Sequence, residues 1–174
     1  GSTKDTTFGS ILVNGLKDET LETRIAAIQA LGMIQYKPAV KPLGDLIQKT
    51  DTETERLSAT ISLGMIGDRA AVPSLEQLLE DEQANIRWDA AIALAKMGEK
   101  SGAYIIEGLL DREYLNQFKQ VDPIEQSRVL MVAINTASIL FDKRFESKLT
   151  FLSKNDQDLS IRDAAIKALE KNYK

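Results

Sequence analysis

Residues 24–34 read RIAAIQALGMI, and residues 56–66, thirty-two positions further on, read RLSATISLGMI. The match continues downstream, because AVKPLGDLI at 39–47 lines up with AVPSLEQLL at 71–79 in the same register. A third copy begins at Arg87. Self-similarity at a fixed period of this length indicates an array of stacked repeats, in which each unit buries its hydrophobic face against its neighbours.

Each repeat is predicted to contain two helices. Alanine and leucine recur at spacings of three and four through 21–33, which is the period of an α-helix. Gly67 and Gly98 fall where the first helix must end, because glycine accepts the left-handed conformation of a C-cap. Pro42 and Pro73 lie near the start of the second helix, where a proline loses no hydrogen bond.

The pattern predicts an all-α fold, an α-solenoid or superhelix of stacked helix pairs with about four to five units, and more than about 65% helix with essentially no strand. We treat 1–174 as a single domain of such repeats. Its expected parts are an N-terminal capping helix at 3–16, repeat 1 at 18–49, repeat 2 at 51–80, repeat 3 with an extended end at 81–118, an irregular repeat 4 at 119–154 and a C-terminal half repeat or cap at 156–174.

Composition narrows the possible functions. The formal net charge of −4 and the pI near 5.0 leave no excess of positive charge to neutralise a phosphate backbone, so nucleic acid is not an expected partner. The sequence contains no histidine and no cysteine, which removes the nucleophile systems and metal sites built on these residues. No glycine-rich phosphate loop is present either. We therefore expect no enzymatic activity, no metal and no cofactor.

The cellular location is not assigned by the sequence. No apolar run approaches the roughly 20 residues of a membrane span, and no signal peptide opens the chain. A soluble, cytoplasmic protein is favoured. Export stays open because Gly1-Ser2 resembles a cloning remnant, so that a targeting segment or further repeats could have been removed.

The repeat resembles a known family. The pattern Arg-x-x-Ala-x-x-Ala-Leu-Gly-x-Ile-Gly, followed by Ala-Val-x-x-Leu-x-x-Leu-Leu, is similar to the short HEAT-like repeat named after phycobilisome lyases. The resemblance covers about 18–111 and, as a half unit, 156–170. It implies that the second helix of each repeat lines the concave inner surface and that the first lies outside. The residues that carry it in the second repeat are Asp51, Arg56, Ala59, Leu63, Gly64, Ile66, Gly67, Ala71, Val72, Leu75, Leu78 and Leu79.

Two functions remain open at this point. The favoured one is a non-catalytic protein–protein interaction scaffold or adaptor, expected to be a monomer, that binds a protein or peptide through its concave face. The alternative is a lyase-like or chaperone-like module that handles a chromophore or another small apolar ligand, and only the family name suggests it. Fold alone does not decide between them, because such repeats serve several functions.

Helical phase and one irregular stretch select the candidate partner-binding residues. On the second helices we choose side chains that point away from the core. The stretch DREYLNQFKQVDPIEQS at 111–127 pushes the next helix out of phase. It is either a lengthened helix and a loop, with Asp122-Pro123 starting the next helix, or a binding insertion with two aromatic side chains on one helical side. The candidates are Lys41, Asp45, Gln48, Gln77, Glu80, Tyr104, Glu107, Asp111, Tyr114 and Phe118.

A second set of residues forms a charged row. An aspartate precedes an arginine at a nearly constant spacing in each copy. An aspartate at a helix entrance that faces an arginine of a neighbouring unit would form a ladder of charge-assisted hydrogen bonds. We favour this structural role over a catalytic or anion-binding row. The predicted ladder consists of Asp18, Arg24, Asp51, Arg56, Asp81, Arg87, Asp156 and Arg162.

Overall fold

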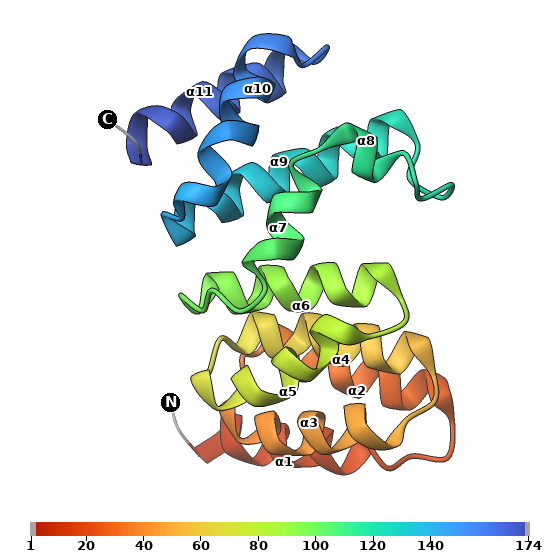
Figure 1. Ribbon diagram of the computed structural model, residues 1–174. Helices are drawn as coiled ribbons and strands as arrows, with labels where there is room; N and C mark the ends of the chain where they lie inside the picture. Colours follow the sequence, from red (N-terminus) through yellow and green to blue (C-terminus); the bar gives the residue numbers. More distant parts are fainter. Residues whose placement is uncertain (1–2, 173–174) are drawn as a thin grey trace. The chain divides into compact units, whose positions relative to one another are not determined.

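The structure is a computed structural model that describes the backbone of residues 3–172 and the side chains from Thr7 onward (Figure 1). Helices account for 78% of the chain, and no strand occurs within 3–172, so the predicted all-α fold is confirmed. The chain divides into two compact units, 1–97 and 98–174. We describe each unit by itself, and the assignment of 1–174 to one domain remains a prediction.

The first unit is a two-layered helical array. Helices α2, α4 and α6 pack side by side, while α3 packs on α4 and α5 packs on α6. Helix α1 packs against α2 at the start of the array. The helices are α1 (Thr3–Gly15), α2 (Leu21–Met33), α3 (Val40–Lys49), α4 (Glu53–Ile66), α5 (Val72–Gln77) and α6 (Ala84–Lys96), with 3-10 turns at Lys37–Ala39, Arg69–Ala71 and Leu78–Glu80.

The first helix of each repeat ends in a left-handed residue. Gly67 and Gly98 have φ values of 66° and 82°, as the sequence predicted. In the first repeat the equivalent position is Gln35, which adopts φ 51°. A left-handed conformation costs a residue with a Cβ roughly 1–2 kcal/mol, so the first repeat closes its helix at a penalty that the glycines avoid.

Small residues let the first helices approach one another closely. A Cβ added to Gly32 would lie 2.8 Å from Cα of Ser62, and one added to Gly64 would lie 2.9 Å from Cβ of Ala93. Ala59 is fully buried on the same helix. Helices α2, α4 and α6 therefore meet through glycine, serine and alanine, and the leucine and isoleucine side chains fill the core behind them.

The second unit contains α7 (Ala103–Leu109), α8 (Arg112–Leu115), α9 (Pro123–Leu140), α10 (Glu146–Asn155) and α11 (Leu159–Asn172), with a 3-10 turn at Lys143–Phe145. Helix α9 packs against α7 and α11, and α10 packs on α11. The start of α9 is as predicted. Asp122 caps it by accepting hydrogen bonds from the backbone N–H groups of Ile124 and Glu125, with Pro123 in the first turn.

The irregular stretch is neither a lengthened helix nor a regular helical turn. The prediction that Tyr114 and Phe118 share one side of a helix is wrong, because α8 ends at Leu115. The reason is Asp111, which is extended and accepts a hydrogen bond from the backbone N–H of Glu113, so that a new and very short helix starts there. The two aromatic rings nevertheless meet edge to face, with 5.2 Å between their centroids.

Candidate functional site

The predicted partner-binding residues of the first unit form one polar row on α3 and α5. Lys41 and Asp45 make an exposed ion pair with Nζ 2.9 Å from Oδ2. Gln48 donates from Nε2 to Oε1 of Gln77 at 3.3 Å, which links the second helices of two successive repeats. Glu80 is exposed in the 3-10 turn after α5. These side chains face solvent, as helical phase predicted.

The predicted residues of the second unit lie along α7 and the irregular stretch. Tyr104 is exposed and Glu107 half-buried on α7. Asp111 is held by the ammonium group of Lys148 on α10, and Tyr114 and Phe118 contact each other. The structure thus joins Asp111 to a residue that helical phase did not select.

One aspartate–arginine pair of the predicted ladder joins two repeats among the described residues. Arg56 meets Asp81 of the next repeat, with Nε 2.9 Å from Oδ2, and both side chains are largely buried. Arg87 donates to the backbone oxygens of Asp81 and Glu82 instead of to a carboxylate. At the start of the array the carboxylate of Asp18 accepts from the backbone N–H of Thr20.

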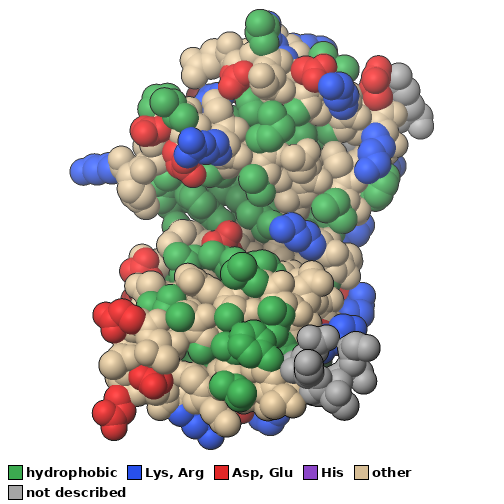
Figure 2. All heavy atoms as spheres, turned by 180° about the vertical axis from the view of Figure 1, so that it is seen from behind, with side chains coloured by type: hydrophobic (Ala, Val, Ile, Leu, Met, Phe, Trp, Pro, Cys, Tyr) green, Lys and Arg blue, Asp and Glu red, His purple; other side chains and the backbone are tan. Residues whose placement is uncertain are grey.

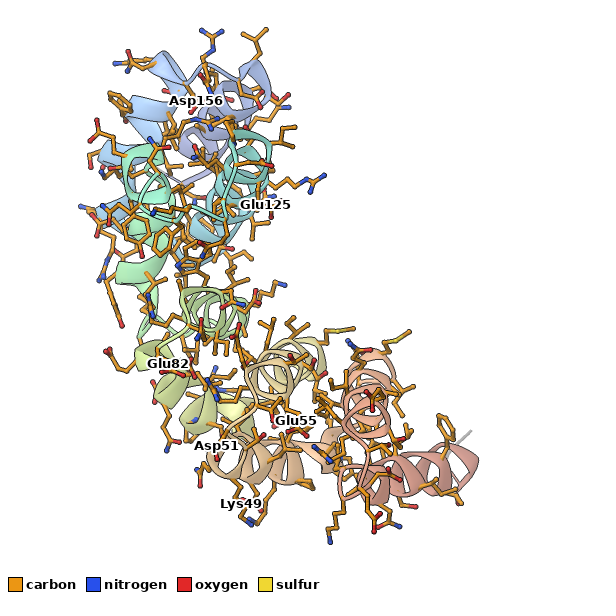
Figure 3. The ribbon with its side chains drawn as sticks, turned by 90° about the vertical axis from the view of Figure 1, so that its right-hand side faces the viewer. Lys49, Asp51, Glu55, Glu82, Glu125 and Asp156 are labelled. Carbon is orange, nitrogen blue, oxygen red and sulfur yellow. The ribbon has the colours of Figure 1, made fainter. Side chains whose placement is uncertain are left out.

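Arg24 is paired with a residue outside the predicted ladder. Nε of Arg24 lies 2.5 Å from Oε1 of Glu55, which is buried in the first turn of α4, whereas Asp51 is exposed before that helix (Figure 3). The hydroxyl of Thr50 donates to the other oxygen of Glu55 at 2.5 Å. Burial would raise the pKa of Glu55, but the hydrogen bonds from Arg24 and Thr50 outweigh it and hold the pKa below its usual value.

Asp156 is also paired with a residue outside the predicted ladder. It is bound by Arg112, with Nε and Nη2 at 2.8 and 2.9 Å from the two carboxylate oxygens. Burial would raise the pKa of Asp156, but the bidentate contact with Arg112 and the hydrogen bond from the backbone N–H of Asp158 together outweigh it and lower the pKa. Nη2 also donates to the hydroxyl of Ser127 at 3.1 Å.

Arg112 fills a vacancy in the repeat. The fourth residue of a first helix is an arginine in α2, α4, α6 and α11, but in α9 it is Gln126. Gln126 is buried and donates to Oδ1 of Asn116. The irregular stretch therefore supplies, through α8, the guanidinium group that α9 lacks. The sequence contained a signal for this arrangement. Gln126 stands where the other first helices have arginine, and Arg112 occurs in the irregular stretch before it.

A groove of about 570 Å³ lies beside this ion pair, between the start of α8 and α10. The sequence analysis selected two of its residues, Asp111 as a partner-binding candidate and Asp156 as a ladder member, because it examined helical faces and repeated charges and not a shared cavity. Asp156, labelled in Figure 3, lies where α10 passes into the loop before α11. The lining consists of Leu110, Asp111, Arg112, Glu113, Ser147, Lys148, Phe151, Leu152, Asn155, Asp156 and Gln157.

The groove combines cationic and apolar groups. Nη1 of Arg112 is buried and has no hydrogen-bond partner among the described residues. The ammonium group of Lys148 lowers the pKa of Asp111 and stays partly exposed. Phe151 is 64% exposed and lines the groove with its ring. These groups suit a small molecule that has an apolar body and an anionic substituent.

No described side chains form a cluster of three or more that could hold a metal ion. In the described part of the chain, no helix has both the length and the apolar character needed to cross a membrane.

Two family models match the chain. The model described as HEAT repeats matches residues 51–118, and the model described as PBS lyase HEAT-like repeat matches residues 23–49. The resemblance inferred from the sequence is confirmed over these two stretches, and the fold is an α-solenoid of HEAT-like repeats. No curated protein matches it.

The fold is similar to that of a solved complex, CpcE and CpcF of phycocyanin lyase from Nostoc sp. PCC7120. The TM-score is 0.73 at 21% sequence identity, over 95% of this chain and 65% of the other. The chain thus spans about two thirds of the length of that relative. At this identity the likeness shows a common fold.

These findings correct the expectation that the chain is not an enzyme. The same fold and the same type of repeat occur in a lyase complex, so a HEAT-like array without a recognisable catalytic motif does not exclude enzymatic function. The expectation was wrong because it considered only the catalytic residues that this one chain could supply. In a complex of two proteins, reactive groups need not all belong to one of them.

Proposed function

We propose that this chain is a lyase-type module that handles a chromophore or a similar small apolar ligand and assembles with a second protein. The observation that carries the proposal is the likeness over 95% of the chain to one solved phycocyanin lyase complex, together with the PBS lyase HEAT-like repeat at residues 23–49.

The groove beside α10 is the site that we propose for the ligand. A volume of about 570 Å³ lies within the range of small-molecule sites, roughly 300–1,000 Å³. Phe151 supplies an aromatic surface for an apolar ring system. The partly exposed ammonium group of Lys148 can donate to a carboxylate of the ligand, while Asp156 and Asp111 hold Arg112 and Lys148 in position.

The role of the chain's own residues in this proposal is to bind and orient. Arg112 is fixed by two hydrogen bonds to Asp156, so its positive charge is held beside the groove without further loss of side-chain freedom. Lys148 is mobile enough to exchange Asp111 for a ligand carboxylate, because the pair is partly exposed. The second protein would complete the covering of the ligand.

Biliverdin, a linear tetrapyrrole with two carboxylates, is a suitable probe. We expect it to raise the melting temperature of the chain, because a ligand that binds only the folded state stabilises it, and we expect its absorption spectrum to change. Phe151→Ala should weaken binding. Leu159→Ala is the matched control, since Leu159 is an equally exposed apolar residue on α11.

A set of fatty acids and phospholipids tests the broader class of small apolar ligands. If neither biliverdin nor any lipid changes the melting temperature, the ligand-handling proposal is wrong. If a ligand binds but Phe151→Ala and Leu159→Ala behave alike, the function stands and the groove is not its site.

For the second protein we propose two surfaces selected from the sequence, one on each unit. They consist of Lys41, Asp45, Gln48, Gln77 and Glu80 on the first unit and of Tyr104, Glu107, Asp111, Tyr114 and Phe118 on the second. The double variant Tyr104→Ala and Phe118→Ala tests the surface on the second unit in co-purification with a candidate partner. Equal recovery of that partner by wild type and by a variant that is folded to the same extent would reject this surface.

A further inference from the structure

Hydrophobic side chains lie exposed on the layer formed by α2, α4 and α6 of the first unit. Met33 is 72% exposed at the end of α2, and Ile61 and Met65 are exposed on α4. The amide of Gln35 donates to the backbone oxygen of Met65 at 3.0 Å, so the end of α2 lies beside the end of α4. Figure 2, seen from behind, shows hydrophobic side chains gathered on the first unit.

A shallow groove of about 90 Å³ runs between α4 and α6 on this layer. Its floor consists of Gly64 and Ala93, where the two helices approach most closely. Its walls are Ile61 and Met65 on α4 and Asp89, Ile92 and Lys96 on α6. The missing Cβ of Gly64 therefore creates a furrow in which apolar side chains flank the carboxylate of Asp89.

Asp89 is the unusual member of this groove. Its carboxylate is half-buried among apolar side chains and makes no hydrogen bond or ion pair within the described residues. Lys96 lies two helical turns away and forms no ion pair with it. Burial raises the pKa of Asp89, and the nearby Lys96 opposes this only in part. A partner that covered the groove with apolar atoms alone would leave this carboxylate buried and unpaired, which is costly.

From this charge requirement we infer that the groove between α4 and α6 binds an amphipathic helix of a partner protein that presents an arginine or lysine to Asp89 from within its apolar stripe. The apolar side chains of that helix cover Ile61, Met65 and Met33, and its cation pairs with the carboxylate. Helix-in-groove binding of this kind is recognised by apolar anchors at spacings of three and four. The inference does not rest on the ligand-handling function, because the groove belongs to the first unit.

A displayed library of helical peptides tests this. The apolar stripe is fixed at helical spacing, and one position at its centre is randomised. On the wild-type chain we expect selection to enrich arginine and lysine at that position, and on Asp89→Asn we expect this preference to disappear. Glu22→Gln is the matched control, because Glu22 is an exposed acid of the same unit that lies outside the groove.

The affinity of a selected arginine peptide gives the second readout. Asp89→Asn should weaken it roughly thirtyfold or more, because it removes one partner of a covered charge pair. Met65→Asp should abolish binding, and circular dichroism would confirm that both variants remain folded. Failure to enrich a basic residue, or equal enrichment on Asp89→Asn, would overturn the inference.

Sedimentation velocity of the free chain tests whether a second copy of this chain, instead of a partner helix, covers the groove between α4 and α6. A dimer that Met65→Asp dissociates would show that another copy of this chain covers the groove, and the inferred partner helix would then be wrong.

Discussion

The contact between Gly64 and Ala93 leads to a prediction that can be tested by exchanging the two residues. Gly64→Ala adds a methyl group 2.9 Å from Cβ of Ala93, well inside the contact distance of two carbon atoms. Overpacking of a core costs about 1–3 kcal/mol, while replacing a glycine within a helix by alanine gains up to about 1 kcal/mol. We expect a net loss of roughly 1 kcal/mol in the free energy of unfolding.

The reverse change, Ala93→Gly, loses the helix propensity of alanine and one buried methyl group, together about 2 kcal/mol. In the double variant the methyl group moves from α6 to α4, and the nearest atom to it becomes Cα of residue 93 at 3.7 Å. Its stability should return to within about 0.5 kcal/mol of wild type. The coupling energy between the two sites is then about 3 kcal/mol.

Urea denaturation followed by far-ultraviolet circular dichroism measures these differences, provided that all variants share one m-value. Gly108→Ala is the control, because a Cβ at that position meets only the Tyr114 ring at 3.4 Å or more and should leave stability unchanged or slightly raised. Additivity of the two single changes within about 0.5 kcal/mol would refute a direct contact of the two helices at this point.

Three further predictions follow from particular contacts. Gln35→Gly should stabilise the chain by about 1 kcal/mol, because glycine adopts φ 51° without a Cβ clash and only one exposed hydrogen bond is lost. Chemical denaturation measures this difference, and a less stable variant would show that the left-handed conformation of Gln35 carries no energetic penalty. Arg112→Met should cost roughly 2–4 kcal/mol by leaving Asp156 buried without its cation, and Gln126→Arg in that background should recover part of the loss. Asp111 and Asp156 have lowered pKa values in the folded state. The stability that they contribute is therefore present above the unfolded pKa, near 4, and is lost as the pH falls through the lowered values. Asp111→Asn should reduce this loss in denaturation curves measured from pH 6 downward to about pH 2.

The fold was predictable because the same residue types recur at the helix ends and helix contacts of successive repeats. Gly67 and Gly98 end their helices as predicted, and the alanine positions lie at helix contacts. At Gln35 the residue type alone does not predict the left-handed end of the helix. Its left-handed conformation follows from its place in the repeat and not from its own residue type, so only the alignment of repeats reveals it.

The charged ladder was predictable in kind but not in its partners. Sequence spacing places Asp51 before α4, but it does not show that Glu55, one turn into that helix, is buried and reaches Arg24. Arg112 was missed for a related reason. Its contact with Asp156 joins residues 44 positions apart across an irregular stretch, where the period of the repeat gives no guidance.

The groove beside α10 was beyond reach from the sequence. Phe151 lies in a region that matches the repeat poorly, and nothing in its neighbours predicts that the ring is exposed. Periodicity identifies which face of a helix is apolar, whereas a cavity depends on how two irregular segments meet.

The arginine pairs give each array a direction. Arg24 reaches Glu55, Arg56 reaches Asp81 and Arg112 reaches Asp156, so in every case the cation belongs to the earlier segment and the anion to the later one. A repeat cut out of the middle would carry an unmatched positive group at its trailing end and an unmatched negative group at its leading end. Such repeats pair their charges only when they follow one another in the same orientation. Duplicated or transplanted repeats must therefore keep that orientation to form the same ion pairs.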